Sequence, residues 1–359
     1  MKTRTLPLSI AMMSVLLSLT MLAFVVGSSK TAQAAETMEF PKDIKIGSSP
    51  GGAYAVTEGL CSLVKREMGI SAVPYRGSGA TDRLVVMVDK QIDLALLSND
   101  TIRYAFEGKK VFKEKGKLPV RILAGIQIAP IHMATWHGSG VTGVKSARGK
   151  RMMFDFVTSL FTIAVGERLL EFNGMTRNDV RVQKFSTFKD AMNALRERTT
   201  DLLVHPGSVG GSSYWMELTS QTDIDFISFT EEERRFVVEK EPYLVPDPVI
   251  VPAGVYKGLD KDVLCVGFMN TYIARADAND DFVYKVMKIL FDDVGLDKPG
   301  RFVKFHADTG SFTIKRALWA AGNAPFHAAA VKYYKERGFW TEALEKTQRK
   351  LLAEAGTSR

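Results

Sequence analysis

Within one stretch, Ile44–Gly59, the spacing of hydrophobic residues changes from that of a strand to that of a helix. This change predicts the first strand and the first helix of the fold. A short apolar strand there breaks into a turn of small residues and then opens a helix that ends at Gly69. The helix is marked by apolar residues at helical spacing, namely Val56, Leu60, Leu63 and Val64. Free N–H groups at such a helix N-terminus favour a carboxylate or phosphate. The alternative is a tight turn that only packs.

The same alternation continues after this helix. Ser71–Tyr75 and Ile92–Leu97 read as strands, and the helix between them places Leu84, Met87 and Val88 on one face. A β-α-β-α-β order predicts a parallel sheet.

That order recurs 107 residues further along the chain. The second set comprises strand Arg151–Phe156, helix Thr162–Phe172, strand Val180–Lys184, helix Phe188–Arg198 and strand Asp201–Val204. The two sets are not alike in sequence, so the repeat is one of architecture. It predicts an α/β protein with two similar lobes, each a mostly parallel sheet flanked by helices. The ligand cleft should lie between the lobes, at the carboxyl ends of the strands.

Two long apolar stretches, Val120–Trp136 and Val263–Ala274, are candidates for strands that cross between the lobes. If both cross, lobe 1 comprises residues 37–133 and 272–359, and lobe 2 comprises residues 134–271. The charged stretch 229–241 reads as a solvated helix. Three tail helices should wrap lobe 1, at Ala317–Ala321, Phe326–Gly338 and Thr341–Glu354.

The first 34 residues read as a cleaved signal peptide. Lys2 and Arg4 precede the apolar run Leu6–Val26, and Ala32-Gln33-Ala34 fits a cleavage site. The alternative is an uncleaved membrane anchor, because the run is long enough to span a bilayer. Cleavage leaves 325 residues, enough for two domains, and places the mature protein in the periplasm.

Charge and cysteine content narrow the class of protein. The formal net charge is +8, and removal of three positive residues with the signal peptide leaves about +5. This mild excess suits small anions, but there is no block of basic residues that would indicate nucleic-acid binding. Cys61 and Cys265 are far apart in sequence, and we expect two separate buried thiols rather than a disulfide.

No catalytic or metal-binding constellation is found. The five histidines lack the H-x-x-x-H spacing of a helical zinc site, and no G-x-S-x-G nucleophile elbow occurs. His205 lies near Ser208, but proximity in sequence alone is a weak signal. We therefore expect no catalytic residue, no metal and no cofactor.

Small and polar residues at the strand ends remain as candidate ligand contacts. They are Gly51, Gly52, Ala53, Tyr54, Arg76, Ser78, Gly79, Ser98, Asn99, Thr158, Ser159, Thr162, Gly207 and Ser208. Arg76, the cation in these turns, could hold a carboxylate by a bidentate pair or make only a local surface ion pair. Tyr54 could close over a ligand or cap the lobe.

These motifs in their order resemble the TAXI-type substrate-binding receptors of tripartite ATP-independent periplasmic (TRAP) transporters. The resemblance covers most of the mature chain. It rests on Gly51-Gly52-Ala53-Tyr54, Ile92-Asp93-Leu94-Ala95 before Ser98-Asn99-Asp100, Glu167-Arg168-Leu169-Leu170 with Gly174, Tyr243-Leu244-Val245-Pro246, Ile250-Val251-Pro252-Ala253-Gly254-Val255-Tyr256, and Pro325-Phe326-His327 before Tyr333-Tyr334-Lys335.

The resemblance implies a type II periplasmic-binding fold that closes on its ligand. It also implies that the ligand is a small organic acid or amino acid, such as glutamate or 2-oxoglutarate, delivered to a membrane permease driven by an ion gradient. The chain departs from the family where a glycine-rich turn usually opens the first helix of lobe 2, because here the turn reads Thr158-Ser159-Leu160-Phe161-Thr162. Phe154, Phe156 and Phe161 should make that wall bulkier and more apolar, so the ligand of the family does not transfer to this chain.

The sequence thus predicts a monomeric periplasmic solute receptor for a small carboxylate or amino acid, with TRAP permease subunits as partners. A ligand sensor of the same fold for a membrane signalling protein is one alternative. A periplasmic enzyme acting on a small acid is the other, and the missing catalytic groups argue against it.

Overall fold

The computed structural model describes residues 40–49, 51–77, 79–156 and 159–356. The described residues from Asp43 onward form one compact unit. The expected signal peptide lies outside the described residues. No helix in the described part of the chain is both long and apolar enough to cross a membrane.

The first β-α-β-α-β repeat is confirmed, and we call residues 43–98 the first repeat. It consists of β1 (Asp43–Ser48), α2 (Gly52–Met68), β2 (Ser71–Arg76), α3 (Ala80–Val88) and β3 (Leu94–Ser98). β1 pairs in parallel with both β2 and β3. The helix α2 ends where Gly69 adopts the left-handed conformation that a C-cap requires.

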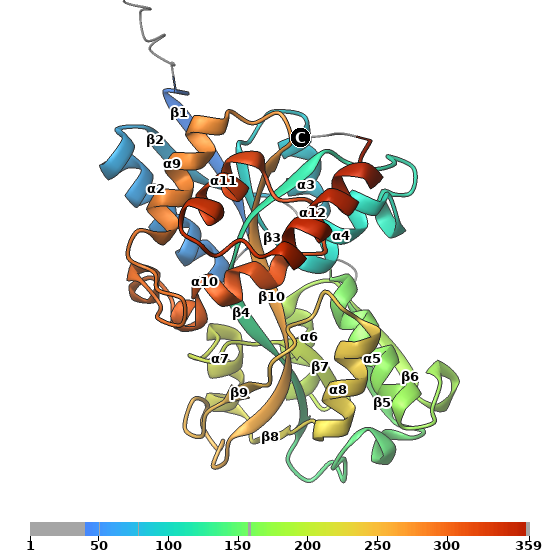
Figure 1. The fold of residues 1–359 in the computed structure, drawn as a ribbon. Helices are drawn as coiled ribbons and strands as arrows, with labels where there is room; N and C mark the ends of the chain where they lie inside the picture. The colour runs from blue at the N-terminus through green and yellow to red at the C-terminus, as the bar shows by residue number, and fades with distance from the viewer. Residues whose placement is uncertain (1–39, 50, 78, 157–158, 357–359) are drawn as a thin grey trace, which may run out of the picture. The chain divides into compact units, whose positions relative to one another are not determined.

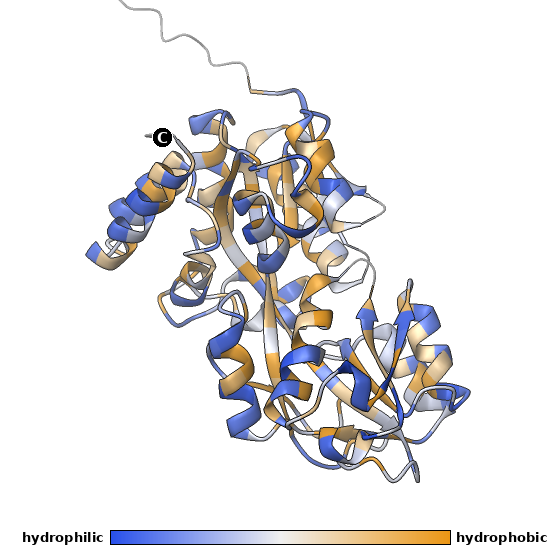
Figure 2. Ribbon diagram, turned by 90° about the vertical axis from the view of Figure 1, so that its right-hand side faces the viewer, coloured by the Kyte–Doolittle hydropathy of each residue, from blue (hydrophilic) through white to orange (hydrophobic). Residues whose placement is uncertain are grey.

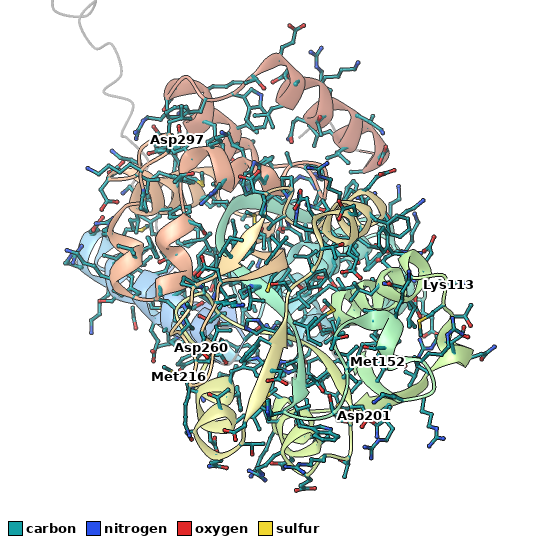
Figure 3. All side chains as sticks on the ribbon, turned by 90° about the horizontal axis from the view of Figure 1, so that it is seen from below. Lys113, Met152, Asp201, Met216, Asp260 and Asp297 are labelled. Atoms are coloured by element: carbon teal, nitrogen blue, oxygen red, sulfur yellow. The ribbon has the colours of Figure 1, made fainter. Side chains whose placement is uncertain are left out.

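The second repeat, residues 151–206, has the same order. It consists of β5 (Arg151–Phe156), α5 (Leu160–Phe172), β6 (Arg181–Phe185), α6 (Phe188–Arg196) and β7 (Leu202–Pro206). β5 pairs in parallel with β6 and β7. Arg151 at the start of β5 binds Asp201 just before β7 with two guanidinium hydrogen bonds, at 2.7 and 3.0 Å (Asp201 is labelled in Figure 3).

One sheet includes both repeats, because two long strands run through it. They are β4 (Val120–Trp136) and β10 (Val263–Arg275), as expected from their apolar runs, and they pair antiparallel (Figure 1). The strand order is β2-β1-β3-β10-β4-β7-β5-β6. The fold is therefore mixed α/β, with parallel pairing inside each repeat and helices flanking the sheet. The expected lobe boundaries at 133/134 and 271/272 stay a prediction.

The remaining elements connect or cover this frame. They are α4 (Asn99–Glu107), α7 (Ser213–Gln221), β8 (Ile224–Ile227), α8 (Glu231–Lys240), β9 (Val249–Val251), α9 (Asp280–Phe291), α10 (Ile314–Ala317), α11 (Ala328–Glu336) and α12 (Glu342–Glu354). Short 3-10 helices include Arg301–Lys304 and Ala307–Ser311. The tail is helical, as predicted, but its first predicted helix is divided into α10 and a 3-10 turn, Leu318–Ala320.

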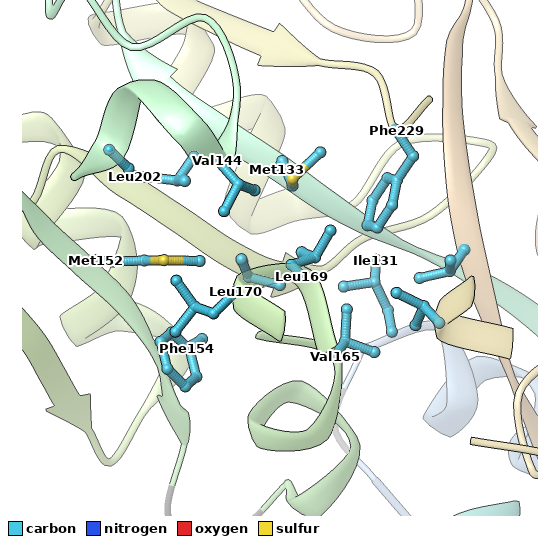
Figure 4. Close-up of a cluster of buried hydrophobic side chains, with 14 of the residues drawn as sticks. Ile131, Met133, Val144, Met152, Phe154, Val165, Leu169, Leu170, Leu202 and Phe229 are labelled. Carbon is cyan, nitrogen blue, oxygen red and sulfur yellow. The ribbon is translucent and has the colours of Figure 1, made fainter. Parts of the chain in front are cut away.

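Hydrophobic residues gather on the strands and on the helix faces next to them, while hydrophilic residues lie on the outer helices (Figure 2). A core cluster in the second repeat joins Met152 and Phe154 of β5, Val165 and Leu169 of α5, and Ile131 of β4 (Figure 4). These five side chains are fully buried. This core sets α5 against the sheet and so fixes where its N-terminus lies.

The structure corrects one sequence-based expectation about α3. Its buried residues are Arg83, Leu84 and Met87, whereas Val88 is only partly buried. The apolar pattern predicted Leu84, Met87 and Val88 as the inner face. An arginine therefore occupies a position on the inner face of a core helix.

Candidate functional site

The glycine pair before α2 has local structural reasons for its composition. Gly51 has φ +81°, a conformation that favours glycine, and serves as the N-cap of α2. A Cβ on Gly52 would lie 2.6 Å from the His306 ring and 3.1 Å from Nε2 of Gln127. Ala53 is buried. The turn thus packs tightly against His306 and Gln127, and it still leads into the N-terminus of a 17-residue helix.

Arg76 and Tyr54 contact each other at the exposed edge of the first repeat. The guanidinium carbon of Arg76 lies 3.8 Å from the centroid of the Tyr54 ring, a cation–π contact. Arg76 is exposed and Tyr54 is half-buried. At an exposed site such a contact contributes about 0.5–1 kcal/mol. Their expected ligand contacts stay a prediction.

Arg83 is a second cation at this edge, and it is not among the ligand contacts predicted from the sequence. It is only 3% exposed. Its Nη2 donates to Oγ of Ser49 at 2.7 Å, and its Nε has no hydrogen-bond partner in the described structure. Burial lowers the pKa of the guanidinium to about 10, and the nearby charge of Asp82 offsets this only partly. An anion placed here would satisfy a donor that the described residues leave unpaired.

The turn after β2 allows Arg83 to reach this position. A Cβ on Gly77 would lie 2.6 Å from Cγ of Arg83, so a side chain at residue 77 would displace the arginine stem. Gly79 is the extended N-cap residue of α3, and its carbonyl accepts the Arg83 N–H at 3.1 Å. Ser78, a predicted ligand contact, lies outside the described residues.

Three polar residues directly after β3, namely Asn99, Asp100 and Thr101, are buried and have different environments. The hydroxyls of Ser98 and Thr101 are 3.2 Å apart, and Oδ1 of Asn99 accepts from Thr271 at 2.7 Å. Asp100 is 2% exposed, and neither of its carboxylate oxygens reaches a partner with hydrogen-bond geometry. Burial raises the pKa of Asp100 to about 6, although the Ser98 hydroxyl and the Phe161 N–H favour its charged form.

The N-terminus of α5 lies close to Asp100, since Phe161 belongs to the first turn of that helix. Ser159, the N-cap residue, is buried, and its hydroxyl has no partner in the described structure. The Thr162 hydroxyl donates to the Ser159 carbonyl at 2.8 Å and is fully buried. Thr158 lies outside the described residues. Of the predicted pair of hydroxyls, only that of Ser159 is without a partner here.

Tyr104 and Tyr243 complete the surroundings of Asp100. Their rings meet edge to face, with centroids 6.0 Å apart. The Tyr243 hydroxyl is buried without a partner, and burial followed by the charge of Asp100 raises the pKa of Tyr243. Glu241, which is also buried, accepts from Nε of Arg168 at 2.8 Å and so has its own counter-ion. Among the described residues, Asp100 has no such cation.

The predicted ligand contacts after β7 are already occupied by the protein itself. The Ser208 hydroxyl and the Val209 N–H donate to Oδ1 of Asp308, at 2.7 and 2.9 Å. Nε2 of Gln127 donates to Oδ2 of the same carboxylate at 3.1 Å, and Asp308 is 2% exposed. A residue of the C-terminal segment thus binds the turn where we expected a ligand. No pattern in the sequence indicates this contact, because Asp308 lies 100 residues from Ser208.

Packing accounts for the glycine at position 207, and its expected ligand contact stays a prediction. A Cβ there would lie 1.9 Å from Nε2 of His132, and the Gly207 N–H donates to the Pro130 carbonyl at 2.8 Å. Burial lowers the pKa of His132 to about 3 and that of His205 to about 4, so both imidazoles are neutral at pH 7. The two histidines belong to an aromatic cluster around Trp215.

The expected apolar wall of the second repeat is partly wrong. The Phe154 ring packs under Gly166, where a Cβ would lie 2.3 Å from it, and it belongs to the core. Phe156 stacks on Phe185 with ring centroids 4.5 Å apart. Phe161 stacks on Phe268 at 4.3 Å. Of the three rings, only Phe161 is on the helix turn next to Asp100.

The cysteines are both buried and free, as expected. Burial raises the pKa of the Cys61 thiol to about 12 and also raises that of Cys265. Neither is therefore a thiolate at neutral pH. Among the described residues, no group of three or more histidine, cysteine, aspartate or glutamate side chains is arranged to hold a metal ion.

Comparison with known proteins identifies the family. Residues 44–338 match the model of the NMT1-like family, and the chain belongs to that family. No curated protein matches the chain in sequence.

Three solved structures illustrate the likeness in fold. The periplasmic aliphatic sulphonate binding protein SsuA from Escherichia coli is 11% identical, with a TM-score of 0.47 over 89% of this chain and 90% of that one. PhnD1 from Prochlorococcus marinus (MIT 9301), solved with methylphosphonate, is 10% identical, with a TM-score of 0.48 over 84% and 100%. An ancestral arginine-binding protein bound to arginine is 11% identical, with a TM-score of 0.46 over 75% and 98%. Likeness at this level does not indicate which ligand this chain binds.

Proposed function

We propose that this protein is a periplasmic solute receptor that captures a small organic anion or amino acid and delivers it to a TRAP-type membrane permease. The proposal rests mainly on the environment of Arg83. It is a buried cation with an unpaired donor, and it lies between the turns that end β1 and β2. Carboxyl ends of strands in open α/β sheets are where such proteins bind ligands.

Two groups would share the anionic part of the ligand. Arg83 would supply charge-assisted hydrogen bonds, worth about 1.5–3 kcal/mol each. The N-terminus of α2, which follows the turn that contains Ser49, would add roughly 0.3–1 kcal/mol, or up to about 2 kcal/mol if partly buried. Binding at about 1 μM corresponds to roughly 8 kcal/mol, so these contributions would be a large share of it.

A role in transport rather than catalysis is supported by the state of the polar groups. The buried His132 and His205 are neutral, and the Ser208 hydroxyl donates to Asp308 rather than to His205. A nucleophile needs a base within hydrogen-bond reach, and this serine has a carboxylate that also accepts two other hydrogen bonds. An unchanged ligand recovered from the protein would agree with a receptor.

The first experiment is native mass spectrometry of the purified protein, followed by denaturation and identification of the released molecule. The proposal expects a small organic acid or amino acid, and calorimetry should show that Arg83→Ala weakens its binding at least tenfold. A neutral or cationic ligand, or an Arg83→Ala variant that binds like the unmodified protein, would contradict it.

Delivery and location need separate tests. Uptake of the identified ligand into vesicles that contain the permease should require this protein and an ion gradient, and should continue without ATP. N-terminal sequencing of periplasmic protein should give Ala35 or Glu36 as the first residue. Uptake that depends on ATP, or a chain that retains Met1 in the membrane, would contradict the respective part of the proposal.

A further inference from the structure

Two buried charged side chains lie next to the carboxyl ends of the first repeat, and one of them is Arg83, whose burial the nearby charge of Asp82 offsets only partly. The other is Asp100, in the first turn of α4 directly after β3. Both side chains are at least 97% buried, at 3% and 2% exposure, and each has at least one polar atom without a partner in the described structure. Buried charges are normally paired, because removing a charge from water is costly.

The two charges lie at neighbouring strand ends but do not pair with each other. β1 and β3 are adjacent and parallel, with Gly47 opposite Ala95, so Ser49 and Ser98 belong to the same edge of the sheet. Arg83 is bound to Ser49, and Asp100 follows Ser98 by two residues. The ion pairs among the described residues do not include one between Arg83 and Asp100.

The surroundings of the two charges are complementary in hydrogen-bonding type. Arg83 presents an unused N–H donor. Around Asp100 the unused atoms are oxygens, namely its two carboxylate oxygens and the hydroxyl of Tyr243. An ammonium group carries three donors and no acceptor, whereas a carboxylate has only acceptors. The first place therefore suits an anion, and the second suits an ammonium.

We infer that Arg83 and Asp100 bind the two ends of a zwitterion, with the anionic group of the ligand on Arg83 and its ammonium group on Asp100. This inference rests on the proposed function and narrows its ligand class from organic anions or amino acids to amino acids and related zwitterions alone. Asp100 thereby becomes a specificity-determining residue, because a ligand without an ammonium would leave its carboxylate buried and unpaired.

Matched probes test the inference. Calorimetry should be run with the molecule released from the purified protein, with α-amino acids, and with the ω-amino acids from β-alanine to 6-aminohexanoate. Each probe is paired with the same carboxylate lacking the amine. The length of the preferred ω-amino acid would report the spacing between the two charges. We expect each zwitterion that binds to do so at least tenfold more tightly than the same carboxylate without the amine.

Variants separate recognition from structure. Asp100→Asn, which keeps the shape, should remove most of the preference for the zwitterion while leaving the amine-free partner within about threefold. Tyr243→Phe should reduce the preference less. Asp89→Asn, an exposed aspartate at the end of α3, is the matched control and should change nothing. Thermal unfolding of each variant checks that it folds.

The outcomes are distinguishable. If the released molecule is an anion without an amine, and Asp100→Asn leaves all affinities unchanged, the inference is wrong and the proposed function stands. If Asp100→Asn weakens the binding of the zwitterion and of its amine-free partner equally, Asp100 does not recognise the ammonium group and affects binding only through the structure of α5. The inference is then also wrong. If neither kind of probe binds and nothing is released, both the inference and the proposed function fail.

Discussion

The strand-end turns of the two repeats hold equivalent places in the β-α-β-α-β order but differ in how their polar groups are satisfied. In the first repeat, Arg83 is buried with an unpaired donor. After the second repeat, the donors of the turn at Ser208 already bind the carboxylate of Asp308. A repeated architecture therefore does not imply repeated chemistry. The edge that still lacks a partner is the better candidate for a ligand, and the satisfied edge is better explained as an internal contact.

Removal of Asp308 should have the largest effect and would test the assignment of the second turn. Asp308→Ala leaves Ser208, Val209 and Gln127 without their shared acceptor, so we expect the free energy of unfolding to fall by about 3–4 kcal/mol. Urea unfolding measures this, with exposed Asp297 (labelled in Figure 3) changed to alanine as the control. A loss below 1 kcal/mol would show that these donors find other partners and that the turn is open to ligands.

Asp100→Asn should change how stability depends on pH. The raised pKa of Asp100, about 6 against an ordinary 3.8, means that the folded protein binds a proton there more tightly than the unfolded chain. This group therefore stabilises the fold as the pH falls from 6 towards 4, and it destabilises the fold at pH 7. Relative to the unmodified protein, the free energy of unfolding of the asparagine variant should therefore rise between pH 4 and pH 7, by roughly 3 kcal/mol at most.

Urea unfolding of both proteins across this pH range would give the difference. The ionisable groups that interact with Asp100 are Tyr104 of its own helix and Tyr243 of the segment after α8, and Glu241 interacts with both tyrosines. The tyrosines do not titrate in this range, since their pKa values are raised. A difference that does not vary with pH would mean that Asp100 keeps an ordinary pKa and is not isolated from counter-charge.

Arg83→Ala and Arg76→Ala compare the buried and the exposed cation of the same edge. With the identified ligand, calorimetry should show at least a tenfold loss for Arg83→Ala, or about 1.4 kcal/mol. Arg76→Ala should lose less than threefold, because that guanidinium is exposed and rests on the Tyr54 ring. The opposite ranking would restore Arg76 as the residue that holds the carboxylate, as the sequence suggested.

Thr162→Val should have the smallest effect. The Thr162 hydroxyl donates to the Ser159 carbonyl and is fully buried, so its loss should lower the free energy of unfolding by about 0.5–1.5 kcal/mol. Ligand affinity should stay within twofold. A tenfold loss of affinity without a loss of stability would mean that this hydroxyl turns towards the ligand.

The sequence predicted the repeats, the crossing strands and most boundaries, because each depends on local periodicity and turn residues. Gly69 and the apolar run of β10 are examples, since neighbouring residues alone decide them. It did not predict Arg83, because the helical pattern of α3 is satisfied equally well by a face that contains Val88. The hydrogen bonds of Asp308 could not be predicted for a different reason. Its partners are distant in sequence, and nothing in its own neighbourhood signals them.

The antiparallel ladder of β4 and β10 gives the molecule a mechanical property. Because these strands lie between the two repeats in the sheet, a change in angle between the repeats must bend or twist a hydrogen-bonded ladder rather than swing on a loose linker. Such a ladder is elastic, so the motion has a stiffness and a rest angle. The register shifts at Asn270/Thr271 and Tyr272/Ile273 interrupt the ladder. They are its most compliant points, and substitutions there should change the stiffness of the motion before they change the affinity of any contact.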